Sequence, residues 1–291
     1  MPGEQDPGTA AGDDPASTAQ PGPAQQNSVQ QGPVQFDTSV AHIARVYDYW
    51  LGGKDNFAAD REAAEQAIAA NPGVRAGVLA NRAFLARAVR YLAAERGIRQ
   101  FLDIGTGIPT ADNTHEVAQA AAPESRIVYV DNDPVVLLHA RALLASHPAG
   151  AADYIDADAR DTGTILAGAA RTLDFGQPVA ILMLLLLHLI PDEDDPYGIV
   201  ARLMAAVPPG SYLVITHVAA DIEVEAMAEM AQRLNRMVAQ KGTMRTRAQI
   251  TRFFDGLELA EPGIVQPQLW RPSGPVSLAN VTAWSGVARK P

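Results

Sequence analysis

The chain has 291 residues, is 47% hydrophobic, and carries 33 Asp and Glu against 23 Lys and Arg, a net charge of -10. This length allows one large core with appendages, and the acidic balance argues against nucleic acid as a partner, because phosphate binding needs clustered basic side chains. There is no cysteine, which excludes disulfides, thiolate metal sites and cysteine nucleophiles and agrees with a cytoplasmic location.

Residues 1–35 are rich in Pro, Gln, Gly, Ala and Thr and contain no aromatic side chain and no Lys or Arg. Such a segment buries too little apolar area to offset its ordering entropy, so we predict a disordered tail. No basic region followed by an apolar run opens the chain, so no secretion signal is expected.

A helical pattern covers residues 36–99 and predicts an N-terminal helical lid or cap. Ser39 can cap the first helix, and Gly52 and Gly53 end it. The pattern predicts two further helices, over about 60–70 and 77–96.

From residue 100 to residue 291, strand patterns alternate with helical ones. The expected strands cover about 100–104, 126–131, 152–156, 179–187, 212–217, 257–261 and 281–288. The expected helices cover about 110–122, 134–146, 160–170, 196–207, 222–240 and 246–254. This alternation predicts an α/β fold with a doubly wound seven-stranded sheet, mostly parallel with an antiparallel pair at one edge. The apolar run Val179–Ile190 is too short to span a bilayer, so we expect a buried strand and no membrane association.

The segment Phe101–Thr110 reads as a buried strand followed by a turn with two glycines, Gly105 and Gly107. Glycine lets the backbone approach a ligand closely, because no Cβ intervenes. The next strand ends in acids, and Asp131 there can accept hydrogen bonds from both ribose hydroxyls of a nucleoside. The sequence therefore predicts a nucleoside site at the carboxyl ends of a parallel sheet.

The glycine turn lacks the third glycine of the dinucleotide fingerprint, and Pro109 withholds one N–H donor. A pyrophosphate would miss that donor, whereas S-adenosylmethionine, which has no phosphate, would not. Asp103, inside the strand, is expected to organise the loop and face the ammonium group of this cofactor. The alternative is that the glycines serve only a tight connection and Asp103 pins it through backbone N–H groups.

Longer strings of the sequence resemble a known family. They are ARVYDYWLGGKDNFAADR, NRAFLARAVRYLA, GIRQFLDIGTGIPT, VYVDNDPVVLLHARALL, YIDADARD and PGSYLVITH. With the Rossmann-like sheet they resemble the actinobacterial S-adenosyl methyltransferase family, formerly a domain of unknown function, within the class I S-adenosylmethionine-dependent methyltransferases. The resemblance covers about residues 37–291. It implies that residues 100–291 form the methyltransferase domain and bind S-adenosylmethionine.

The resemblance carries cofactor contacts onto this sequence residue by residue. It implies that the backbone of Gly105, Thr106 and Gly107 approaches the methionine part of the cofactor. It also implies that Asp131 binds the ribose hydroxyls and that Asn132 follows it toward the adenine.

Adenine and sulfonium contacts are implied at two further strand ends. Asp158 matches the acid that accepts from the adenine amino group, and Ala159 would offer its backbone N–H to the ring. Leu187 and His188 lie at the end of the fourth strand, where class I enzymes face the sulfonium and the methyl acceptor.

Two histidines at strand ends are candidate catalytic residues. His188 and His217 could each remove a proton from an acceptor hydroxyl or amine, or each could be bonded to backbone at a strand end. The acids of 192–195 are interpreted as a helix cap, so no metal site is expected.

The loop around Gly52 and Gly53 is polar and aromatic, and loops on a rigid scaffold often carry function. We expect Tyr47, Lys54 or Asn56 to touch the cofactor or the acceptor, with the segment closing over the cofactor. The alternative is a capping turn that packs on the sheet.

These observations favour a methyltransferase that acts on an oxygen or nitrogen nucleophile of a small molecule or a protein. One alternative is a noncatalytic S-adenosylmethionine-binding sensor or partner module, because no known acceptor motif follows the fourth strand. Another is a nicotinamide-dependent oxidoreductase, which Pro109 and Asp158 disfavour. The sequence leaves the acceptor and the oligomeric state open.

Overall fold

The computed structural model describes residues 37–136, 138, 146–276 and 280–291. Residues 36–291 form one compact unit, so the N-terminal helices belong to the same unit as the sheet. The tail predicted to be disordered, 1–35, lies outside the described residues.

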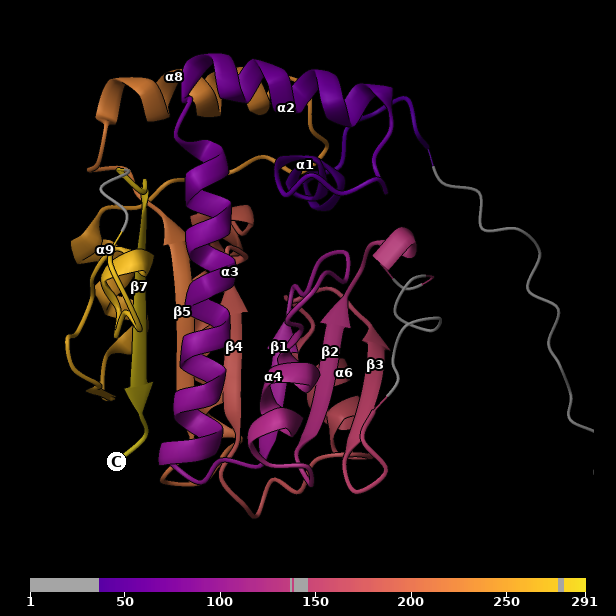
Figure 1. Cartoon of the computed structure of the whole chain (residues 1–291), viewed down its shortest axis with the longest axis vertical. Coiled ribbons are helices and arrows are strands. Elements are labelled where there is room, and N and C mark those ends of the chain that lie inside the picture. The colour runs from indigo at the N-terminus through magenta and orange to yellow at the C-terminus, as the bar shows by residue number, and fades with distance from the viewer. Residues whose placement is uncertain (1–36, 137, 139–145, 277–279) are drawn as a thin grey trace, which may run out of the picture. The chain divides into compact units, whose positions relative to one another are not determined.

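A seven-stranded sheet forms the centre of this unit (Figure 1). Its strands are β1 (Gln100–Ile104), β2 (Arg126–Asp131), β3 (Ala151–Asp156), β4 (Ala180–Leu184), β5 (Tyr212–Val218), β6 (Glu258–Leu259) and β7 (Ala283–Arg289). Their order is β3-β2-β1-β4-β5-β7-β6, and β1 to β5 pair in parallel. Strand β7 is antiparallel to both of its neighbours, β5 and β6. The predicted fold class is confirmed. In the antiparallel edge pair, β6 is the outermost strand and β7 lies between β6 and β5.

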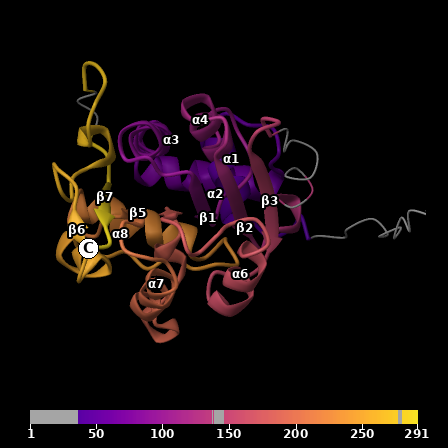
Figure 2. The same ribbon diagram turned by 90° about the horizontal axis from the view of Figure 1, so that it is seen from below.

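Alternating side chains of each strand build two apolar layers, because successive residues point to opposite faces of a sheet. In β1, Leu102 and Ile104 join one core cluster, and Phe101 joins the other. Figure 2 shows α3 and α4 on one face and α6 and α7 on the other. These helices are α3 (Val74–Arg90), α4 (Thr114–Ala121), α6 (Thr162–Ala169) and α7 (Pro196–Ala205). A π-helical turn, Tyr91–Glu95, continues α3, and α9 (Arg247–Thr251) precedes β6.

A third group of helices lies over the carboxyl ends of the parallel strands (Figure 1). It consists of α1 (Ile43–Trp50), α2 (Ala58–Ala70) and α8 (Val224–Leu234). Their buried residues share one cluster, in which Val46 of α1, Ala67 of α2 and Met227 of α8 have no exposed surface. Segments more than 150 residues apart in sequence thus form one cap above the end of the sheet where a ligand would bind.

Two predicted helices differ from the structure in extent. Helix α4 begins at Thr114 rather than near residue 110, so the loop after the glycine turn is longer than predicted. Helix α8 ends at Leu234, short of residue 240. Most of the helix predicted over 134–146 lies outside the described residues, although Pro134–Val136 are helical.

Strand β4 ends at Leu184 rather than at residue 187. Leu185 has φ of 49°, in the left-handed region, and its N–H donates to the backbone oxygen of Thr216 at 3.0 Å and to Oγ1 of Thr216 at 2.9 Å. A 3₁₀ turn, Leu187–Leu189, follows. The strand therefore stops three residues early, so Leu187 and His188 lie in a turn and not in the strand.

Candidate functional site

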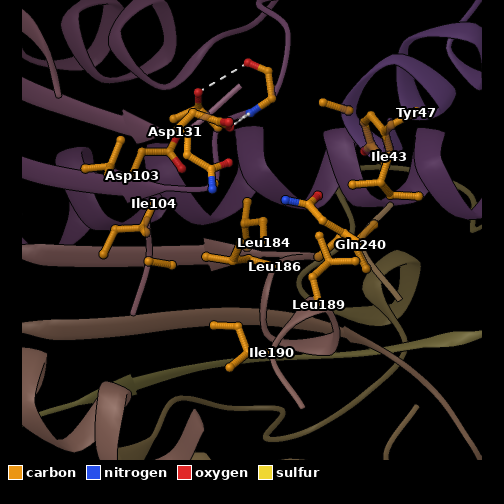
Figure 3. A pocket seen from close by; sticks show the side chains of 18 of the residues that line it. Ile43, Tyr47, Asp103, Ile104, Asp131, Leu184, Leu186, Leu189, Ile190 and Gln240 are labelled. Carbon is orange, nitrogen blue, oxygen red and sulfur yellow. Dashed lines mark hydrogen bonds between the residues drawn. The ribbon is translucent and has the colours of Figure 1, made fainter. Parts of the chain in front are cut away.

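A cavity of about 140 Å³ opens at the carboxyl ends of β1, β2 and β4, and we call it the strand-end cavity. Figure 3 shows Asp103 and Asp131 on one side of it, Ile43 and Tyr47 of α1 on the other, and Gln240 between them. Sequence-predicted residues that line it are Tyr47, Asp103, Gly105, Thr106, Gly107, Asp131, Asn132, Asp158 and Ala159. Nine of the predicted site residues, from four separate segments, thus meet at one cavity.

The glycine turn is held against the end of β2. Gly105 and Gly107 both have positive φ, 75° and 65°, a conformation that favours glycine. A Cβ on Gly105 would come within 2.6 Å of Leu186 Cδ1, whereas a Cβ on Gly107 would meet open space. The Gly107 N–H donates to Asp131 Oδ2 at 2.8 Å. This bond fixes the turn and the acid relative to each other.

Asp131 closes β2 with its carboxylate turned into the cavity. Its Oδ1 accepts from the Asp133 N–H at 3.0 Å, and its Oδ2 accepts from Gly107. Burial raises the pKa of Asp131 above its usual value, against the effect of these two N–H bonds. Since each ionised carboxylate oxygen can accept about two hydrogen bonds, each oxygen keeps capacity for one more donor.

Asp103 is the most deeply buried acid of the cavity, with 5% of its surface exposed. Burial raises its pKa to about 6, although the Thr114 hydroxyl donates to its Oδ2 at 2.6 Å and acts in the opposite direction. A cation placed beside this carboxyl would favour its charged form.

Asp158 follows β3 and is paired inside the protein. Arg160 donates to it from Nε at 2.8 Å and from Nη2 at 2.6 Å, and Asn132 Nδ2 lies 3.3 Å from its Oδ2. The Arg160 hydrogen bond holds the pKa of Asp158 below its usual value. Arg160 also lines the cavity and reaches Asp194 at 2.8 Å. Sequence reasoning missed Arg160, although it stands two residues from Asp158.

The loop of 52–57 does not reach the strand-end cavity. Asn56 is buried and donates to Asp48 Oδ2 at 2.8 Å and to the Gly53 carbonyl at 3.1 Å, so its amide is used to fix the turn. Lys54 is exposed and lines no part of the cavity. Only Tyr47 of the three residues expected from this region lines it, with its hydroxyl accepting from Asn81 Nδ2 at 2.9 Å.

Leu187 also lies away from the cavity. Its side chain has no exposed surface and packs in the core, because the 3₁₀ turn after Leu185 directs it inward. Leu184, Leu185 and Leu186 line the cavity in its place. The expectation of a cofactor contact at Leu187 depended on a longer strand.

The two candidate catalytic histidines have different environments. His217 is fully buried, with Nδ1 2.8 Å from the Val218 carbonyl and Nε2 3.0 Å from Arg245 Nη1. Because Arg245 can only donate, Nε2 must accept, and Nδ1 must carry the proton that it donates to the carbonyl. Burial lowers the pKa of His217 to about 3. Both nitrogens of this neutral ring are engaged, which leaves none for an acceptor.

His188 has both ring nitrogens unengaged by the described residues. Its Nδ1 is sealed from solvent without a hydrogen-bond partner there, and its Nε2 makes no hydrogen bond either. The pKa of His188 is lowered to about 4, mainly by burial and to a smaller extent by the positive charge of Arg245. The ring is therefore neutral at pH 7. It lines a second cavity that adjoins the first.

Arg245 anchors the loop that carries His188. Its side chain is 1% exposed and donates to the carbonyls of Leu187 at 2.8 Å and Ile190 at 2.9 Å. It also reaches Asp192 Oδ1 at 2.6 Å. Nothing in the local sequence marks this role, because the hydrogen-bond partners of the Arg245 side chain lie between 28 and 58 residues away.

Two other residues of the strand-end cavity were not predicted. His42, at the start of α1, places Nδ1 2.8 Å from Asp133 Oδ2 and so ties the cap to the end of β2. Arg82 of α3 donates to the carbonyls of Ala111 and Asp112 at 2.9 and 3.0 Å and holds the loop beyond the glycine turn. Arg82 lies in NRAFLARAVRYLA, one of the strings that resemble the family, and this resemblance could have marked it as a site residue.

Within the described ranges, no helix is long and apolar enough to cross a bilayer, and no cluster of three His, Asp or Glu could hold a metal ion.

No curated protein matches the chain. A protein of the DUF574 family from Streptomyces avermitilis is 44% identical, with a TM-score of 0.85, over 88% of this chain and 100% of its own. A methyltransferase candidate from Thermobifida fusca is 43% identical, with a TM-score of 0.81, over 87% of this chain and 96% of its own.

A more distant structure shares the fold. The plantazolicin methyltransferase BpumL is 11% identical, covers 85% of this chain and 96% of its own, and has a TM-score of 0.51. The profile described as S-adenosyl methyltransferase matches residues 29–291, nearly the whole chain. The chain therefore belongs to the S-adenosyl methyltransferase family, whose cofactor is S-adenosylmethionine.

Proposed function

We propose that this protein transfers a methyl group to an oxygen or nitrogen nucleophile of a small molecule, with the cofactor held in the strand-end cavity. The observation that carries the proposal is the hydrogen bond of 2.8 Å between the Gly107 N–H and Asp131 Oδ2. It joins the glycine turn of β1 and the acid of β2 at one cavity, the arrangement that a nucleoside ligand requires.

The ribose and methionine ends of the cofactor fit groups that the cavity presents. Asp131 has capacity for two further donors, one at each oxygen, which matches two ribose hydroxyls. Asp103 faces the same cavity with a raised pKa of about 6, which a neighbouring ammonium group would lower. At Gly105 a Cβ would collide with Leu186, so only glycine permits this close wall.

The adenine end fits less directly. Asp158 lines the cavity, but its oxygens already accept from Arg160 and Asn132. Among the residues that the structure describes, the backbone N–H of Ala159 donates to no other group, which leaves it for a ring nitrogen. We therefore assign the ring contact to Ala159 and a shared hydrogen-bonding role to Asp158.

We assign His188 as the general base. When bound, the cofactor would supply a methyl group on a sulfonium: the acceptor's oxygen or nitrogen would bond to the methyl carbon while the C–S bond breaks, and the sulfur would leave with the electron pair as a neutral thioether. His188 would accept the acceptor's proton at Nε2, the ring nitrogen that is not sealed off. His217 is left out of the machinery because both of its nitrogens are engaged.

A transfer assay tests the proposal. Purified protein given methyl-labelled S-adenosylmethionine with panels of small phenols and amines is expected to label at least one acceptor. His188→Asn should lower kcat for that acceptor about 100-fold, with the affinity for S-adenosylhomocysteine unchanged, because His188 does not line the strand-end cavity.

His147→Asn is the matched control, because His147 is exposed and precedes β3 at the opposite end of the sheet. This variant should transfer methyl groups like the wild type. Full activity in His188→Asn would remove His188 as the base. Cofactor binding without transfer to any acceptor would favour a noncatalytic binding protein.

A further inference from the structure

A second cavity, which we call the apolar chamber, lies between the cap helices and the end of β4. It has a volume of about 110 Å³, space for about seven to eleven water molecules. Apolar side chains from α1, α3 and α8 and from the segment before α9 form its walls: Trp50, Val78, Met227, Met230, Leu234 and Met244. Methionine is unbranched and adaptable, so such walls can fit ligands of irregular shape.

The apolar chamber adjoins the strand-end cavity and shares part of its wall. Ile43, Tyr47, Leu185, Leu189 and Gln240 line both. Figure 3 shows Gln240 at this junction, between Ile43 and Leu189. A molecule in the chamber would therefore face a cofactor in the strand-end cavity across a short boundary, as an acceptor must for direct methyl transfer.

The chamber has no charged wall in the described part of the chain, since no Asp, Glu, Lys or Arg lines it. Most of its polar groups are already paired: the Asn235 amide with the backbone of Gly242, and the Trp50 indole with the Ala64 carbonyl. Two groups are left without a hydrogen bond from described residues, the His188 ring and the Gln240 amide.

We propose that the apolar chamber binds the methyl acceptor and that the acceptor is an uncharged, largely apolar molecule of about one or two fused rings with a single hydroxyl or amine. The inference rests on the proposed function and adds the substrate class to it. An uncharged wall disfavours ionic ligands, because a buried charge without a partner is costly. His188 and Gln240 would bind the one polar group, with His188 taking its proton.

Gly77 offers a way to fill the chamber. It lies in α3, lines the chamber, and has open space where a Cβ would stand. Gly77→Leu should place a side chain in the chamber without a backbone clash, and helix propensity favours the change. Gly163→Leu is the matched control, because Gly163 is an exposed glycine of α6 whose Cβ would meet only Asp161 Oδ1, at 3.6 Å.

In the experiment, 2-naphthol and naphthalene-2-sulfonate are titrated separately into the full-length protein loaded with S-adenosylhomocysteine, and calorimetry measures the binding of each. We expect 2-naphthol to bind at least about tenfold more tightly than the sulfonate, and Gly77→Leu to weaken it at least about tenfold. Gly163→Leu should bind 2-naphthol like the wild type.

No binding of 2-naphthol, equal binding of the two probes, or equal binding of 2-naphthol by Gly77→Leu and the wild type would overturn the proposal. The affinity for S-adenosylhomocysteine is measured on the same samples and should not change in either variant. If the wild type does not bind S-adenosylhomocysteine, the proposed function is contradicted. If it binds S-adenosylhomocysteine but 2-naphthol does not bind as expected, only the substrate class is contradicted.

Discussion

Replacing Asp131 with Ala is expected to weaken the binding of S-adenosylhomocysteine about 30- to 1000-fold, or about 2–4 kcal/mol. The change removes a carboxyl that has one free acceptor position on each oxygen for the ribose hydroxyls. It also removes the bond to the Gly107 N–H, which holds the glycine turn in place. Calorimetric titration of the wild type and the variant at pH 7 measures the difference.

Asp156→Ala is the control for this prediction. Asp156 ends β3 directly beside Asp131 in the sheet register, is exposed, and does not line the cavity. Its loss should leave the affinity unchanged. Equal affinities of Asp131→Ala and the wild type would show that the ribose does not bind at the end of β2.

Replacing Arg245 with Met is expected to lower the free energy of unfolding by about 3–5 kcal/mol. The variant keeps much of the buried volume but leaves two buried acceptors without their donor, the Ile190 carbonyl and the Nε2 of His217. The Leu187 carbonyl keeps only the Ile190 N–H, at 3.3 Å. Each such unpaired group costs about 1–3 kcal/mol. Urea unfolding followed by circular dichroism measures the change.

Two further variants locate the origin of this effect. Arg245→Lys keeps the charge but lacks the fork of donors, so its loss should be smaller than that of Arg245→Met. Asp192→Asn removes the charge of the partner carboxylate, which is largely exposed, so it should cost less than about 1 kcal/mol. If Arg245→Met unfolds at the same urea concentration as the wild type, the buried hydrogen bonds do not stabilise the loop.

The sequence was sufficient to predict the sheet and the side of the strand-end cavity formed by the glycine turn and Asp131, because both depend on local sequence patterns. Buried strands gave strong apolar patterns, and the two glycines and Asp131 stand at positions that parallel strands bring together. The family strings added Asp158 and Ala159, which line the same cavity.

Other parts of the site depended on backbone geometry that the sequence does not reveal. The left-handed Leu185 ends β4 early, and leucine gives no warning of such a conformation. It turns Leu187 into the core and leaves His188 in a 3₁₀ turn. Asn56 resembles a ligand-binding residue in sequence, but its amide pairs with Asp48 and fixes a turn.

The apolar chamber and Arg245 were beyond sequence reasoning for a different reason. Their residues come from segments far apart in the chain, and only tertiary packing brings α1, α3 and α8 around the end of β4. The methionines of α8 were consistent with ordinary core positions, and nothing local marked Gln240.

The most direct test of the cofactor site is a crystal structure of the full-length protein with S-adenosylhomocysteine. We expect both ribose hydroxyls within hydrogen-bond distance of the Asp131 carboxylate, the amino group of the ligand beside Asp103, and its sulfur facing the junction formed by Tyr47, Leu185 and Gln240. A ligand bound outside the strand-end cavity, or one whose ribose does not contact Asp131, would contradict the account.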